Sequence, residues 1–238
     1  MPLLFLPFRK RGKPIRRFKS FRGQMSDSFR AAVFIILSGG FQDAYTYCCR
    51  GEVFANAQTG NIVLLSTALF RRDWPTVWKY LIPVTFFLIG TAAAEGIHIR
   101  LKNAEKLHWR QIILLGEMAL LGIVGFLPRT VEPLANALVS FVCAMQVQTF
   151  HKVRGHAYAS TMCIGNMRSG TEALCVYFRT REKAVLQKAL TYFGVILVFG
   201  VGAGLGSILT AALGTKAIWI CCALLSVSFG MMFVPERE

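Results

Sequence analysis

Long blocks of apolar residues constrain the fold of this chain more than any other feature. A helix needs about 20 residues to cross roughly 30 Å of hydrocarbon, and only structures that satisfy their own backbone groups are stable there. The blocks therefore predict an all-α protein, a polytopic transmembrane helix bundle of six to eight spans. They cover residues 29–48, 53–70, 78–98, 109–127, 133–150, 158–178, 189–209 and 215–234.

Composition agrees with a membrane protein. Of the 238 residues, 54% are hydrophobic and 16% are charged, whereas a soluble domain carries about a quarter charged residues. The net charge of +15 is unevenly placed, because residues 1–24 hold eight basic residues and no acidic one. Basic residues beside spans mark the cytoplasmic face and contact anionic lipid headgroups. We therefore expect the lipid bilayer, and not nucleic acid, to be the partner of these charges.

Residues 1–26 form a basic arm that we expect to be cytoplasmic and disordered. Its apolar stretch at residues 3–6 is shorter than the hydrophobic core of a signal peptide, which has about 7–15 residues. Met25 begins a segment that reads like a natural start just before the first block. The sequence leaves open whether Met1 or Met25 is the true start.

The second and sixth blocks decide the number of spans. The second begins with a polar run at residues 56–61, and the sixth carries Asn166, Arg168 and Glu172. Each is either a full span or a re-entrant helix shielded from lipid. With eight spans the cytoplasmic side holds 18 Lys and Arg against 8 outside; with six the counts are 20 and 6. Both put the N-terminus in the cytoplasm.

Two segments 104 residues apart resemble each other, which indicates an internal duplication. The halves then cover residues 27–128 and 129–238. Four spans per half would give parallel repeats, and three spans plus a re-entrant piece would give inverted repeats. The matched pairs are Gln42 with Gln146, Arg50-Gly51 with Arg154-Gly155, Phe54-Ala55 with Tyr158-Ala159, residues 59–61 with residues 164–166 after one inserted residue, and, further along, Gly90 with Gly200.

The segment Gly-Gly-Phe-Gln-Asp at residues 39–43, followed by Val-Phe-Ala-Asn-Ala-Gln-Thr-Gly-Asn at residues 53–61, resembles the YoaK-like family of uncharacterised bacterial membrane proteins. The resemblance is specific at residues 38–65 and looser from about residue 27 onward. It implies a multi-pass protein of the bacterial inner membrane with six or more spans. It implies no established activity.

Asp43 lies inside the first apolar block, where an isolated carboxylate is costly and must find a partner or a proton. It predicts a proton- or cation-linked site, with a structural carboxylate as the alternative. Asn56, Thr59 and Asn61 at the start of the second block could expose polar groups to a ligand. They could equally bond neighbouring helices together.

In the second half, Asn166 and Arg168 are the matching candidates. Arg168 and Glu172 are four residues apart and can pair on one helix face. The alternative hypothesis pairs Arg168 with Asp43 across the repeat interface. Two further carboxylates lie in the blocks: we expect Glu95 to be interfacial, and Glu117 to be buried more deeply.

Seven cysteines and four histidines form no metal signature, so we expect no metal and no cofactor. No arrangement of catalytic residues stands out, and we do not expect an enzyme. The glycines of the seventh block permit close helix approach, either within the bundle or in a homodimer. These are Gly200, Gly202, Gly204 and Gly206.

Together these features favour a transporter or exporter of a small solute, with its site between the two repeats. The alternative is a non-transporting membrane scaffold or accessory subunit, in which the polar motif serves helix packing. The sequence does not identify the solute or the direction of its transport. The residues expected to line the site are Asp43, Asn56, Thr59, Asn61, Asn166 and Arg168.

Overall fold

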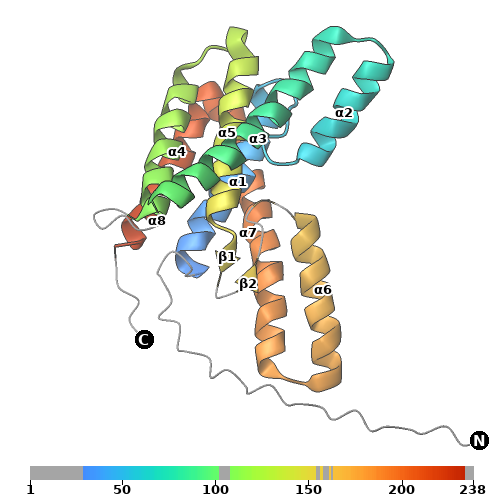
Figure 1. Ribbon diagram of the computed structural model, residues 1–238, viewed down its shortest axis with the longest axis vertical. Coiled ribbons are helices and arrows are strands. Elements are labelled where there is room, and N and C mark those ends of the chain that lie inside the picture. The colour runs from blue at the N-terminus through green and yellow to red at the C-terminus, as the bar shows by residue number, and fades with distance from the viewer. Residues whose placement is uncertain (1–28, 102–107, 154–155, 158–160, 162, 234–238) are drawn as a thin grey trace, which may run out of the picture.

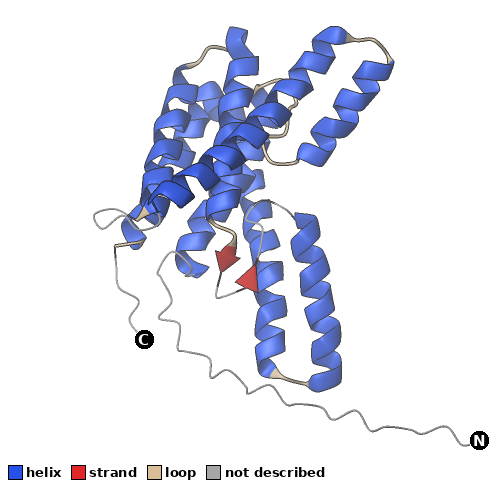
Figure 2. Ribbon diagram, viewed as in Figure 1, coloured by secondary structure: helices blue, strands red, loops and turns tan. Residues whose placement is uncertain are grey.

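The computed structural model describes residues 29–101, 108–153, 156–157, 161 and 163–233, and Figures 1 and 2 show that they are almost entirely helical. A two-residue antiparallel pair, β1 (Lys152–Val153) and β2 (His156–Ala157), interrupts the helices. The predicted all-α class is confirmed. The helices are α1 (Phe29–Cys49), α2 (Gln58–Phe70), α3 (Trp74–Leu101), α4 (Trp109–Phe126), α5 (Glu132–Thr149), α6 (Cys163–Thr180), α7 (Lys183–Leu213) and α8 (Trp219–Met231), with 3₁₀ turns η2 (Arg129–Val131) and η3 (Gly214–Ile218).

Four stretches of the described chain are long and apolar enough to cross a membrane. They are Trp74–Leu101, Trp109–Phe126, Arg129–Thr149 and Lys183–Met231, and the last contains α7, η3 and α8. The prediction of a transmembrane helix bundle is therefore confirmed. Helices α2 and α8 each have 13 residues, fewer than the roughly 20 that a span needs. The 3₁₀ turn η3 directly precedes α8, so the two together form a helical stretch from Gly214 to Met231.

Glycines let two helix pairs pack with their backbones in contact. In the α1–α7 pair, a side chain added at Gly202 would meet the backbone of Leu37, and one at Gly206 would come within 2.9 Å of the Phe41 backbone. In the α3–α5 pair, Gly90 lies on the backbone of Phe141 in the same way. Small residues at such contacts permit the close approach that drives helix association in lipid.

The helix contacts repeat when the first four helices are exchanged for the last four. Helix α1 packs on α7, and α5 packs on α3. The α2–α3 hairpin has its counterpart in the α6–α7 hairpin, and the α1–α8 contact has its counterpart in the α5–α4 contact. Figure 1 shows the two hairpins leaving the central helices as separate arms. Both hairpin turns also place an arginine at positive φ, Arg72 at 58° and Arg181 at 57°.

Contacts around α1 fix the directions of its neighbours. Helices α1 and α7 are parallel, because Leu37 meets Gly202 and, four residues further along both helices, Phe41 meets Gly206. Helix α8 is antiparallel to α1, because Cys221 reaches Ser38 whereas Ser228 reaches Ala31.

The remaining directions follow from contacts made by α4 and α5. Helix α4 runs against α8, since the Trp219 indole donates to the carbonyl of Gly122 and the Cys222 thiol bonds to the carbonyl of Met118. Helices α3 and α5 are parallel, because Gly90 meets Phe141 and Glu95 meets Gln148. The end of α4 and the start of α5 both approach Arg50, so these two helices are antiparallel.

Helices α1, α4 and α7 therefore run one way, and α3, α5 and α8 run the other. Helix α2 forms a hairpin with α3, so it has the direction of α1. Two consecutive helices can run in the same direction only if the chain between them returns along the first helix. The loop between α1 and α2 does so, because the backbone N–H of Asn56 donates to Oδ1 of Asp43 at 2.7 Å. Helix α2 consequently begins beside the middle of α1.

Candidate functional site

The middle of α1 carries a buried polar face. Ser38, Gln42 and Thr46 are spaced four residues apart and all have no exposed surface. The Gln42 side chain donates from Nε2 to Oγ of Ser38 at 2.9 Å, and the Thr46 hydroxyl donates to the carbonyl of Gln42 at 3.1 Å. Because each group finds a partner on its own helix, α1 can bury this face without water.

Helix α5 supplies a matching pair of polar side chains. The Cys143 thiol donates to Oε1 of Gln42 at 3.0 Å, and Gln42 Nε2 donates to Oε1 of Gln146 at 3.4 Å. Gln146 in turn donates from Nε2 to the carbonyl of Ile35 at 2.7 Å. The two helices are thus joined at the centre of the bundle by buried amides.

Asp43 lies on the neighbouring face of α1 and meets the chain that returns toward α2. Besides accepting from the Asn56 backbone, the carboxylate lies within interaction range of the amides of Ala55 and Ala57. The Asn56 side chain fixes this loop by donating from Nδ2 to the carbonyl of Gly39 at 3.2 Å. Successive backbone N–H groups at a helix start form a concave nest that favours negative charge.

The start of α6 reaches the same part of α1. A Cβ on Gly39 would lie 2.6 Å from Cγ2 of Thr161, so only glycine leaves room for this threonine. Cys163, the first residue of α6, lies within electrostatic range of Asp43. The starts of α2 and α6 therefore meet on one segment of α1. We call this the α1 site, defined by Gly39, Asp43, Asn56, Thr161 and Cys163.

Two of the candidates from the sequence, Asp43 and Asn56, lie together in the α1 site, 8% and 3% exposed. Asn61 is buried but serves the local fold, because it donates to the carbonyl of Phe54 at 2.7 Å and accepts from the Phe54 N–H at 3.3 Å. Thr59 is exposed on α2.

In the second half, Asn166 is buried in the first turn of α6, and Arg168 is exposed. Within the described part of the chain, no ion pair joins Arg168 to Asp43 or to Glu172. Neither pairing considered for Arg168 is formed. The match of Arg50-Gly51 with Arg154-Gly155 involves residues outside the described part.

Several residues of this region were not predicted as site residues. Gln146 carried a signal, its match to Gln42 at an offset of 104. Thr161 and Cys163 carried none, because their place depends on how α6 packs. Glu117 is fully buried in α4, and neither carboxylate oxygen has a partner among the described residues. The Cys143 thiol lies within electrostatic range of both Asp43 and Glu117.

The described residues contain no group of three or more His, Cys, Asp or Glu side chains placed to hold a metal ion. The polar groups of the α1 site are a carboxylate, a side-chain amide, a hydroxyl, a thiol and the backbone N–H groups of the chain that leads into α2. Such a set can bind a small polar molecule or an ion and can take up a proton.

Comparison with known proteins identifies the family of this chain. The sequence profile of a family described as "Protein of unknown function (DUF1275)" matches residues 31–231. The chain belongs to this family. A relative, the "UPF0700 transmembrane protein YoaK" of Bacillus subtilis (strain 168), is 25% identical over 213 residues, which cover 86% of this chain and 92% of the relative. No solved structure matches. The resemblance to the YoaK-like family is confirmed, and so is the integral membrane character.

Proposed function

We propose that this DUF1275 protein transports or exports a small solute, and that the α1 site is where the solute binds. The observation that supports this most strongly is the 2.7 Å bond from the Asn56 N–H to Asp43, which places a helix start beside the middle of α1. Discontinuous helices whose ends meet at mid-membrane are the usual way in which transporters hold a substrate. A helix that begins at mid-membrane must be shielded from lipid, because its first backbone N–H groups would otherwise have no partner.

The proposal includes a topology of six spans in two inverted repeats. In this topology α1, α3, α4, α5, α7 and α8 cross the membrane, and α2 and α6 are re-entrant. Support comes from the helix directions. The first half begins with α1 in one direction, followed by α3 and α4 in alternating directions, whereas the second half begins with α5 in the opposite direction, followed by α7 and α8 in alternating directions. The paired contacts α1–α7 and α5–α3 are those that a two-fold axis in the membrane plane would relate.

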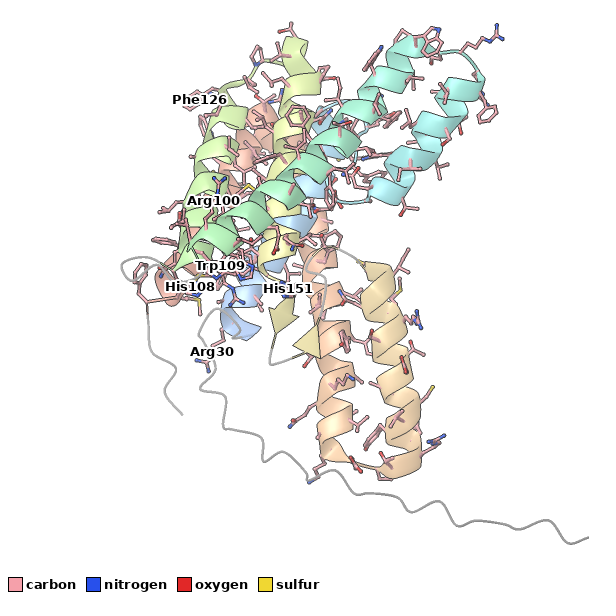
Figure 3. All side chains as sticks on the ribbon, viewed as in Figure 1. Arg30, Arg100, His108, Trp109, Phe126 and His151 are labelled. Atoms are coloured by element: carbon pink, nitrogen blue, oxygen red, sulfur yellow. The ribbon has the colours of Figure 1, made fainter. Side chains whose placement is uncertain are left out.

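We place the N-terminus in the cytoplasm of a bacterial cell, with the protein in the inner membrane. Six spans leave 20 Lys and Arg on the side of the N-terminus and 6 on the other, as the positive-inside rule requires. Figure 3 shows Arg30, His108 and His151 toward one end of the central helices, and Phe126 toward the other. The basic end would contact anionic headgroups.

Flux measurements with the purified chain in liposomes test the transport role. We expect a proton gradient to drive uptake of at least one compound in a broad solute panel, and Asp43→Asn to abolish that coupling. Asp73→Asn is the matched control, because Asp73 is exposed and only caps Thr76 at 3.3 Å. Absence of any flux that depends on Asp43 would remove the main support for transport.

A scaffold or accessory subunit is the second candidate, and one observation favours it. The carboxylate of Asp43 already has a structural task, because it accepts the Asn56 N–H and thereby holds the start of α2. If that is its whole role, Asp43→Asn should lower expression and thermal stability. A variant that assembles normally and loses proton-driven flux favours the transporter.

A further inference from the structure

We propose that the α1 site binds a small monovalent anion, and that the Asp43 carboxylate occupies the anion's place in this structure. This inference rests on the transport role proposed above and names its class of solute. It follows from the donors that surround Asp43, from two buried polar atoms that have no partner among the described residues, and from a difference between the sequences of the two halves of the chain.

The donors around Asp43 are those of an anion site. Its Oδ1 accepts the N–H of Asn56 at 2.7 Å, with the amides of Ala55 and Ala57 in range, immediately before α2 begins. Among the described residues, no Lys, Arg or His forms an ion pair with this carboxylate. Its negative charge therefore faces the backbone amides that lead into α2 and the side chain of Asn56, and no basic side chain among the described residues. The dipole at a helix start complements about half a charge, which suits a single negative charge better than a multiply charged oxyanion.

The second helix start has no carboxylate of its own. At the offset of 104 that aligns Gln42 with Gln146, the counterpart of Asp43 is Val147, which cannot accept the N–H groups of α6. Thr161, just before α6, is 6% exposed, and its Oγ1 has no partner among the described residues. The Thr161 hydroxyl is thus a buried donor that no described residue uses.

Asn56 shows where Asp43 can go when an anion enters. The side-chain oxygen Oδ1 of Asn56 is buried and without a partner in the described structure, although its backbone N–H bonds the Asp43 carboxylate. A carboxylate that takes a proton from the aqueous side becomes an O–H donor, and this oxygen is a neighbouring acceptor. The backbone N–H groups are then released to the anion. One proton enters for each anion bound.

The surroundings of Asp43 contain few other titratable groups. Helix α6 contributes the Cys163 thiol, α5 contributes Cys143, and Glu117 of α4 lies beyond Cys143. The part of the return loop that contacts Asp43, residues 55–57, contributes amides and no charge, and the charged residues Arg50 and Glu52 lie earlier in the loop. Helix α7 meets this part of α1 with small uncharged residues, Gly202, Ala203 and Gly206.

The test uses the full-length protein in liposomes and a panel of chloride, bromide, nitrate, formate, phosphate, a cation and neutral solutes. In the wild type we expect an inward proton gradient to accelerate uptake of the small monovalent anions. In Asp43→Asn, which cannot ionise, we expect anion exchange to persist without response to the gradient. Thr161→Val should weaken the apparent anion affinity about tenfold, the effect of losing one hydrogen bond to a charged group. Thr210→Val is the matched control, because the Thr210 hydroxyl is also buried and unpartnered among the described residues.

The outcomes separate the two proposals. Proton-driven flux of a cation or a neutral solute, with no anion flux, would overturn the anion inference and leave the transport role standing. Absence of all flux in a monodisperse, thermally stable protein would overturn both. If Asp43→Asn fails to fold, anion affinity in Thr161→Val decides, since equal affinity in Thr161→Val and Thr210→Val would contradict the proposed site.

Discussion

Gln42 in α1 donates a hydrogen bond to Gln146 in α5 at 3.4 Å, and the two residues are 104 positions apart. This is the offset that aligns the two halves predicted from the sequence. In an object made of two related halves, a residue touches its own counterpart only on the axis that relates them. The contact supports an axis that passes between the middle of α1 and the middle of α5.

We predict that Gln146→Leu destabilises the protein by about 1–3 kcal/mol, because buried groups then lose a partner. The substitution removes the 2.7 Å bond to the Ile35 carbonyl as well as the contact with Gln42. Unfolding in detergent measures the loss. Gln148→Leu is the control, since Gln148 bonds the partly exposed Glu95. Equal effects of the two substitutions would argue against a central role for the Gln42–Gln146 contact.

The glycines of α7 should differ in their tolerance of alanine. Gly202→Ala would press a methyl group into the backbone of Leu37, whereas a Cβ at Gly200 or Gly204 meets nothing within 4 Å. We expect Gly202→Ala to cost about 1–3 kcal/mol, the usual cost of overpacking, and Gly200→Ala to leave thermal stability unchanged. If Gly200→Ala instead shifts the oligomeric state in detergent, the outward glycines belong to a homodimer contact.

Replacing Arg50 with lysine should destabilise the fold. Arg50 is fully buried, and its guanidinium donates to the Tyr45 hydroxyl at 2.9 Å and to the carbonyls of Val124, Leu127 and Pro128 at 2.9–3.1 Å. Lysine keeps the charge but cannot match this fork of donors. We expect Arg50→Lys to lower the free energy of unfolding by about 2 kcal/mol or more.

The control for Arg50→Lys is the same change at the exposed Arg71. A neutral result at both positions would mean that the end of α4 does not depend on Arg50.

Single-cysteine labelling should place the two hairpin turns on opposite sides of the membrane. In the six-span topology Arg72→Cys faces the outside and Arg181→Cys faces the cytoplasm, because α1 and α7 run in the same direction and α2 follows α1. A topology of eight spans would put both turns in the cytoplasm. Accessibility to a membrane-impermeant thiol reagent in intact cells, in a background without the native cysteines, measures the difference.

Glu117→Gln should fold almost as well as the wild type. Both carboxylate oxygens of Glu117 are buried without partners among the described residues, and an ionised carboxylate is not stable in such a place. The amide has the same shape as the neutral acid, so we expect a change of less than about 1.5 kcal/mol. Glu117→Ala leaves a cavity and should cost about 2 kcal/mol or more. Equal losses would show that the wild-type carboxylate is charged and paired.

The sequence predicted the individual elements well and their assembly poorly. Asp43 and Asn56 were found because polar residues inside apolar blocks are conspicuous, and they do lie together. Arg168 was conspicuous for the same reason, yet it lies exposed on α6 and pairs with neither partner considered for it. Thr161 was not found, because nothing local distinguishes a threonine that packs on Gly39 of another helix.

The sequence by itself determined that this chain is a bundle of membrane helices. Whether a segment can cross the bilayer depends on its own length and apolarity, and both can be taken from the sequence of that segment alone. The sequence also determined which carboxylates would lie in the apolar blocks. Only the tertiary structure decided that α2 doubles back onto α1 and that the starts of α2 and α6 meet at Asp43. These features depend on contacts between segments up to more than 100 residues apart, and such contacts leave no periodic pattern in the chain.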